Sequence, residues 1–118
     1  MTTSVPIYFL DQITPKPGQA EAFFKFYMET YAPAAQARGL KLEHTWINPP
    51  IWLEGAQSNT LFIIWSVEGV AGYWKVMAAP ASLDGSTSHW WRDADPMIET
   101  RSRLVLSDIS NLASLNNV

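Results

Sequence analysis

His44 is the residue best suited to moving a proton, because an imidazole titrates near neutral pH and serves as a general acid or base. It stands two positions before Trp46 in Lys41–Asn48, where polar and apolar residues alternate as in a strand. His44 and Trp46 therefore share one face. A histidine bonded to a backbone carbonyl, in the core or at an interface, fits this spacing equally well, and one step of register reverses the face.

Asp11 interrupts an otherwise apolar run, Ile7–Ile13. A carboxylate in such a strand must be paired, hydrogen-bonded or held neutral by a raised pKa, and each of these states could serve catalysis. The structural alternative is a carboxylate at the strand end that binds loop amides or a basic residue such as Arg103. We count Asp11 as a candidate catalytic residue beside His44.

Tyr27 and Tyr31 lie one turn apart on the apolar face of a predicted helix, where their hydroxyls could orient a ligand. Packing of both rings in the core, with hydroxyls reaching the surface, is the alternative. The chain also holds six tryptophans, which is enough to line an aromatic cavity or a broad aromatic interface. Outside the strand that holds His44, the tryptophans that could line such a cavity or interface are Trp65, Trp74, Trp90 and Trp91.

His89 and Arg92, three positions apart on the last predicted helix, could clamp a carboxylate or phenolate, or could simply form a solvated helix edge. The two histidines stand far apart without a carboxylate at ligand spacing, so we expect no metal site. Gly69 and Gly72 lack the spacing of a phosphate-binding loop, and no serine has the context of a nucleophile elbow. We therefore expect no nucleotide cofactor and no serine hydrolase.

The composition describes one globular domain. The chain has 118 residues, of which 47% are hydrophobic and 13% aromatic, with a net charge of -3 and a pI near 5.2. Scattered Lys and Arg residues give no footprint for nucleic acid. The absence of cysteine excludes disulfides, thiolate metal sites and thiol nucleophiles. We see no signal peptide and no membrane span, and therefore expect a cytoplasmic protein without a membrane partner.

The pattern of apolar residues predicts four strands and three helices that would position these side chains, the last two helices forming one broken helix. A first strand ends at the Pro15 and Pro17 pair, a long helix stops at Gly39 with a kink near Glu29–Ala32 caused by Pro33, and a loop spans Pro49–Asn59. A turn at Asp84-Gly85 and a helix beginning near Ser86 follow, the latter with an apolar face of Trp90, Trp91, Ala94, Met97 and Ile98. The bounds of the four predicted strands are Ile7–Ile13, Lys41–Asn48, Thr60–Val67 and Arg103–Asp108. The first two predicted helices are Gln19–Arg38 and Val70–Met77.

This order predicts an α+β fold of the ferredoxin-like βαββαβ type, with a four-stranded antiparallel sheet and helices on one face only. The nearly unbroken apolar run Thr60–Val67 is typical of a strand covered on both sides. The simplest cover for the open face is the sheet of a second copy, so we expect a homodimer in residues 1–109 and a polar tail at 110–118.

Local motifs support a family resemblance. Pro17-Gly18 opens an acidic, aromatic helix, Asn59 to Trp65 precedes a short helix, and the Trp90-Trp91 helix leads through Pro96 to Arg103. In these features, over most of its length, the chain resembles NIPSNAP-type proteins of the dimeric α+β-barrel superfamily. That resemblance implies two sheets packed into a barrel and the strand order 4-1-3-2, in which the first and second strands are not neighbours.

The superfamily implied by this resemblance includes cofactor-independent monooxygenases, muconolactone isomerases, polyketide cyclases and haem-degrading enzymes, and fold alone does not choose among them. Phe9 and Asp11 stand where the NIPSNAP pattern has a Glu and an Arg, which favours an apolar ligand. The leading hypothesis is a cofactor-free enzyme that performs isomerisation, cyclisation, lyase chemistry or oxygenation on a hydrophobic, aromatic or polyketide-like molecule. In it, His44 is the acid or base, and Asp11, Tyr31 or Arg92 orients the ligand or stabilises an enolate.

Further residues would bind the substrate in this hypothesis, namely Tyr27, Trp46, Trp65, Trp74, His89, Trp90 and Arg92. The alternative is a non-catalytic domain that binds a hydrophobic ligand or a protein partner through its aromatic residues. Haem binding through His44 or His89 follows only from superfamily analogy.

Overall fold

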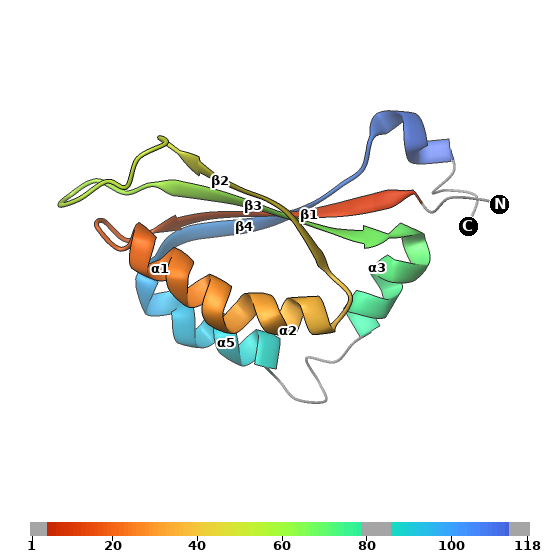
Figure 1. Ribbon diagram of the computed structural model, residues 1–118, viewed down its shortest axis with the longest axis horizontal. Helices are drawn as coiled ribbons and strands as arrows, with labels where there is room; N and C mark the ends of the chain where they lie inside the picture. Colours follow the sequence, from red (N-terminus) through yellow and green to blue (C-terminus); the bar gives the residue numbers. More distant parts are fainter. Residues whose placement is uncertain (1–4, 79–85, 114–118) are drawn as a thin grey trace.

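A four-stranded antiparallel sheet with helices packed on one side forms the protein, an α+β architecture (Figure 1). The computed structural model describes residues 5–78 and 86–113. The strands are β1 (Pro6–Pro15), β2 (Lys41–Asn48), β3 (Thr60–Glu68) and β4 (Ile98–Leu106), in the order β2-β3-β1-β4. Since β1 and β3 occupy the centre, the two most apolar segments of the sequence have neighbours on both edges.

Alternation along the two central strands sends every second side chain toward the helices. On β3, Leu61, Ile63, Trp65 and Val67 are buried, and on β1 the buried set is Ile7, Phe9, Asp11, Ile13 and Pro15. Because antiparallel register pairs Asp11 with Ile63 on one side and with Arg103 on the other, these three side chains share the helix-facing side. The predicted strand Ile7–Ile13 is confirmed, and Pro15 ends it.

The long predicted helix is present, but it is divided. An α-helical part, α1 (Ala20–Phe26), passes through a π-helical turn (Tyr27–Tyr31) into α2 (Ala32–Ala37). Pro33 causes the irregularity predicted near this point, because a proline has no N–H for the usual bond and its ring crowds the preceding turn. The Ala32 N–H bonds to the Tyr27 carbonyl, five residues back. Gly39, with φ +104°, then turns the chain into β2.

The last helix is shorter than predicted. The helix α5 (Ser86–Ala94) gives way to a 3₁₀ turn at Asp95–Met97, which contains Pro96, and β4 begins at Ile98. Placing Met97 and Ile98 on the helix was therefore wrong, and so was a last strand over Arg103–Asp108, since β4 ends at Leu106. The longer strand adds Arg101 to the helix-facing side beside Arg103. The predicted turn at Asp84-Gly85 lies outside the described residues.

A β-bulge in β2 corrects the predicted alternation there. Leu42 pairs with Trp65 but His44 pairs with Ile64, so Glu43 is an extra residue in the ladder. Leu42 consequently faces the helices, whereas His44 and Trp46 share the opposite face as expected. The bounds Lys41–Asn48 are as predicted, and so is the loop at Pro49–Asn59.

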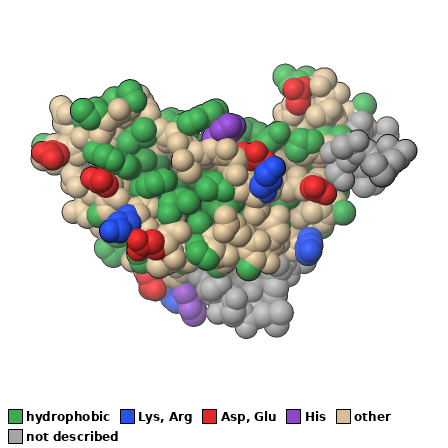
Figure 2. Space-filling model, in the orientation of Figure 1, with side chains coloured by type: hydrophobic (Ala, Val, Ile, Leu, Met, Phe, Trp, Pro, Cys, Tyr) green, Lys and Arg blue, Asp and Glu red, His purple; other side chains and the backbone are tan. Residues whose placement is uncertain are grey.

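The face of the sheet opposite the helices is uncovered and mainly apolar. The helices α1, α2, α3 (Gly69–Ala78) and α5 all lie on one side in Figure 1. Partly exposed side chains on the other side come from all four strands: Tyr8, Leu10, His44, Trp46, Phe62, Ile64, Leu104 and Leu106. We call this set the open face. Coverage of β3 on both sides is thus not achieved by residues 5–78 and 86–113. Figure 2 views the sheet edge-on, as Figure 1 does, and shows hydrophobic side chains along the upper border of the molecule.

Candidate functional site

The centre of the helix-facing side holds a buried ion pair. Asp11 is 1% exposed and receives two bonds from one guanidinium, from Arg103 Nε to Oδ1 at 2.6 Å and from Nη2 to Oδ2 at 2.9 Å. This fork-to-fork geometry is the strongest arrangement available to a carboxylate in a protein. The Arg103 side chain keeps 29% of its surface exposed, so the pair lies at the boundary of the core rather than in its middle.

Tyr27 joins this pair to the core. Its hydroxyl donates to Asp11 Oδ2 at 2.8 Å and accepts the indole N–H of Trp65 at 2.7 Å. Tyr27 and Trp65 are fully buried, and both polar atoms are satisfied. The phenol therefore fixes the carboxylate from the side opposite Arg103.

Tyr31 has an incomplete set of partners. Its oxygen accepts from Arg103 Nη2 at 2.7 Å and, more weakly, from Arg38 Nη2 at 3.5 Å. The residue is 2% exposed, and its hydroxyl acts only as an acceptor in the bonds within residues 5–78 and 86–113, so its proton has no acceptor there. Tyr31 is thus a buried hydrogen-bond donor whose oxygen faces two cations.

Aromatic rings surround both tyrosines. Tyr31 lies 4.8 Å from Tyr27, 5.1 Å from Trp90 and 5.3 Å from Trp91 between ring centroids. The Trp90 indole N–H donates to Thr30 Oγ1 at 2.6 Å. Arg101 lies over the Trp91 ring at 4.3 Å, a cation–π contact. We call Asp11, Tyr27, Tyr31, Trp65 and Arg103 the polar cluster.

The electrostatics of the polar cluster fix the protonation states of Tyr27 and Arg103. Burial raises the pKa of Tyr27 well above its usual value, and the negative charge of Asp11 raises it further. Burial by itself lowers the pKa of Arg103, but the hydrogen bonds and charge of Asp11 outweigh it and the pKa is raised. Tyr27 therefore stays protonated and Arg103 stays charged at every physiological pH.

His44 is separated from this cluster. It is exposed on the open face, stacked on Trp46 with ring centroids 4.4 Å apart. Asp11 lies on the other side of the sheet, two strands away in the order β2-β3-β1-β4, so no Asp11–His44 dyad exists. The structure thus brings Asp11, Tyr27, Tyr31, Trp65 and Trp90 together and places His44 and Trp46 elsewhere.

The remaining candidates are peripheral. Trp74 is 62% exposed on α3, where it contacts Tyr73, and His89 and Arg92 are exposed on α5. None of the three bonds to the polar cluster in the part of the chain that is described. Among the described residues, no group of three or more His, Asp and Glu side chains is placed to hold a metal ion.

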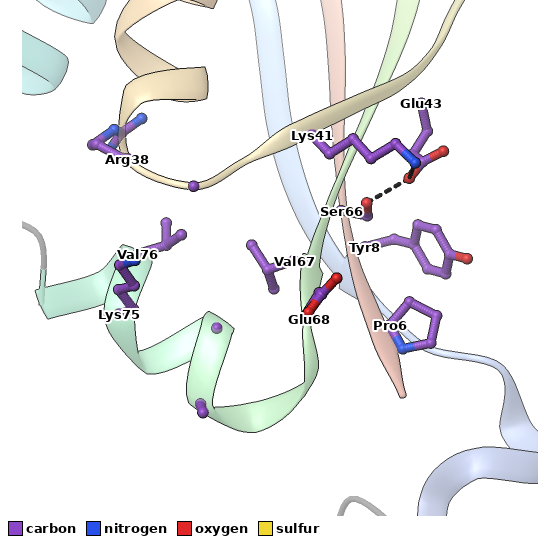
Figure 3. A pocket seen from close by; sticks show the side chains of 13 residues that line it. Pro6, Tyr8, Arg38, Lys41, Glu43, Ser66, Val67, Glu68, Lys75 and Val76 are labelled. Carbon is purple, nitrogen blue, oxygen red and sulfur yellow. Dashed lines mark hydrogen bonds and ion pairs between the residues drawn. The ribbon is translucent and has the colours of Figure 1, made fainter. Parts of the chain in front are cut away.

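A pocket of about 640 Å³ opens between the end of α2, the start of β2 and α3 (Figure 3). Its charged lining residues are Arg38, Lys41, Glu43, Glu68 and Lys75. Arg38 also touches Tyr31, so this pocket and the polar cluster share one side chain. Sequence reasoning overlooked Arg38, which looked like an ordinary cation in the last turn of a helix.

No protein-family model matches the chain, and no curated protein matches its sequence. No helix within residues 5–78 or 86–113 is long and apolar enough to cross a bilayer.

Asp11→Asn and Arg103→Met form a double-mutant cycle that measures the ion pair. Each single change leaves the partner charge without its counter-charge, and we expect each to lower the free energy of unfolding by about 3 kcal/mol. This value is at the lower end of the range for buried ion pairs, because the Arg103 side chain keeps contact with solvent. The double variant should lose about 2 kcal/mol less than the sum. Urea denaturation measures all four proteins, and strict additivity would show that the pair is not coupled. Arg92→Met with Glu99→Gln, both exposed, is the additive control.

Tyr27 makes the protein less stable in alkali. The raised pKa means that the unfolded state loses this proton above about pH 10 while the folded state retains it, so stability falls as pH rises further. Tyr27→Phe should have a lower stability at neutral pH and a flatter decline between about pH 10 and 11. Leu61→Val, a buried change that removes no ionisable group, should keep the wild-type slope. Equal slopes for wild type and Tyr27→Phe in urea titrations would contradict this linkage.

Proposed function

We propose that the chain is a ferredoxin-like protomer of a dimeric α+β barrel, in which two open faces pack together. The strand order β2-β3-β1-β4 and the position of α1, α2, α3 and α5 on one face of the sheet support this fold type. The open face supports the dimer, because a sheet side with Leu10, Ile64, Leu104 and Trp46 in contact with water is the kind of apolar patch that a partner covers. The relation to NIPSNAP proteins stays a prediction.

We propose further that the protein is a cofactor-independent enzyme that performs acid–base chemistry on a small hydrophobic, aromatic or polyketide-like substrate. The observation that carries this proposal is the buried Asp11–Arg103 pair coupled to Tyr31. A domain of this size gains little stability from a buried ion pair compared with apolar residues of the same volume, so a cluster of this kind favours a functional role.

In this proposal Tyr31 is the catalytic residue. Its hydroxyl proton is free of any acceptor within the described chain, and the negative charge left on its oxygen after proton donation would face Arg103 at 2.7 Å. A water molecule would take the proton from the α-carbon of the substrate, and Tyr31 would donate a hydrogen bond or its proton to the enolate oxygen that forms, with the negative charge balanced by the fixed guanidinium. Asp11 and Tyr27 act as positioning residues, because their own bonds to Arg103 and Trp65 are complete.

His44 has a different role here from the one expected from sequence. Its place on the open face, stacked on Trp46, puts it at the proposed dimer interface rather than beside Tyr31. Asp11, expected to orient the ligand or stabilise an enolate, is here the anchor of Arg103.

A charge on the open face tests the dimer. Ile64→Lys would put an ammonium in the middle of the proposed interface, and we expect it to convert the dimer into a monomer in sedimentation velocity. Lys75→Glu, an exposed change on α3, should leave the dimer intact. A wild-type protein that sediments as a monomer over the micromolar range would overturn the proposed assembly.

A Tyr31→Phe variant tests the enzyme. Proton exchange at the enolisable carbon of a panel of aromatic and polyketide-like ketones in D₂O, followed by mass spectrometry, reports acid–base turnover whatever product the full reaction forms. We expect Tyr31→Phe to lower the rate about 100-fold, because it removes the donor that stabilises the enolate. Tyr73→Phe and His44→Ala should stay within about twofold.

Two outcomes of this experiment would count against the enzyme. Tyr31→Phe with unchanged exchange would remove Tyr31 from the reaction. Absence of exchange across the panel would favour the alternative of a non-catalytic domain that binds hydrophobic ligands or partners. Dense packing of Trp90 and Trp91 against Tyr31, with centroids 5.1 Å and 5.3 Å away, is the observation that supports that alternative.

A further inference from the structure

We propose that the pocket in Figure 3 binds the carboxylate of a small hydrophobic acid, with Arg38 as the residue that contacts the anion. The inference rests on the proposed function only in treating this acid as the substrate class. Three features support it: an incompletely bonded guanidinium, the charges that remain unpaired around it, and an apolar lining.

The Arg38 guanidinium is incompletely bonded within residues 5–78 and 86–113. Among these residues its Nε is buried with no hydrogen-bond partner, and Nη2 makes the 3.5 Å contact to Tyr31. A buried donor on a charged group without an acceptor costs free energy, and in solution an anion or water must offset that cost. Arg38 lines the pocket, and a carboxylate is the acceptor that best matches the planar set of N–H donors of a guanidinium.

The other charges around the pocket leave a positive end near Arg38. Glu43 is occupied, since it accepts from Ser66 Oγ at 2.5 Å and lies 4.0 Å from Lys41 Nζ. Figure 3 shows Arg38 and Lys75 toward one side of Val67, whereas Glu68 lies toward Pro6. Among the described lining residues, the anions are therefore paired or set apart, and an incoming carboxylate meets Arg38 and Lys75.

Apart from Tyr8 and Ser66, the uncharged lining residues are small or apolar. Val67 and Val76 are buried, and Gly39, Ala71 and Gly72 leave room that larger residues would fill. A volume of about 640 Å³ lies within the range of small-molecule sites. A carboxylate attached to a short chain or ring fits this division into a cationic end and an apolar wall.

Arg38 also explains how the bound acid would approach the proposed chemistry. Its Nη2 touches the Tyr31 oxygen, which Arg103 also contacts. A carboxylate held by Arg38 would thus be connected to the Tyr31 hydroxyl through that one guanidinium, although Tyr31 itself does not line the pocket.

The probe for this site is 4-phenylbutyrate, compared with its methyl ester, and the readout is the ¹⁵N–¹H shift of the Gly39 and Gly72 amides during titration. We expect the acid to shift both amides and to bind at least tenfold more tightly than the ester. Arg38→Gln should weaken binding at least tenfold, Arg38→Lys less, and Arg92→Gln, on α5 outside the pocket, not at all. Ala71→Phe, at an exposed position of α3, should block the site without touching Arg38.

Failure of the inference is distinct from failure of the enzyme proposal, because binding is measured without turnover. No shift at about 10 mM acid, equal binding of acid and ester, or unchanged binding by folded Arg38→Gln and Ala71→Phe would overturn the pocket assignment. Tight binding of the acid together with unaltered proton exchange in Tyr31→Phe would keep the pocket and remove only the proposed reaction. Thermal unfolding of each variant confirms that it is folded.

Discussion

A buried carboxylate on the central strand is the constraint on which the helix-facing side depends. Asp11 cannot remain ionised in an apolar layer unless donors surround it, and Arg103 and Tyr27 provide three bonds. Those bonds fix the register of β4 against β1 and the rotation of the helix that carries Tyr27. Trp65 is fixed in turn through its indole N–H. A single ionisable residue thus couples two strands and one helix.

The open face imposes the second constraint. Leucine, isoleucine and aromatic side chains emerge from all four strands there, and nothing among the described residues covers them. A bulge at Glu43 turns Leu42 toward the helices while His44 and Trp46 stay on the open face. The irregularity therefore adds to the core and keeps an aromatic pair on the proposed interface.

Strand and helix positions were largely predictable because period-two and helical patterns are local properties of the sequence. Long-range pairing was less accessible: Arg103 was named as one possible partner of Asp11, but spacing could not choose it over loop amides. No Gly or Pro marks the bulge at Glu43 in the sequence, so simple alternation predicted that Leu42 and His44 share one face. The bulge places Leu42 on the opposite face from His44. Pro96 does mark the end of α5, yet the apolar Met97 and Ile98 continue the helical pattern past it.

The π-helical turn links the local sequence to the proposed site. In a regular helix, residues four apart are rotated by about 40° from one another, whereas the wider π turn changes that angle across Tyr27–Tyr31. Here Tyr27 is directed to Asp11, and Tyr31 to Arg103 and Arg38. Pro33 thereby influences the proposed chemistry from a distance, because the π-helical turn that it causes gives the hydroxyls of Tyr27 and Tyr31 different partners. Only Tyr31 then retains a proton to donate, which is why the site's proposed chemistry belongs to it and not to Tyr27.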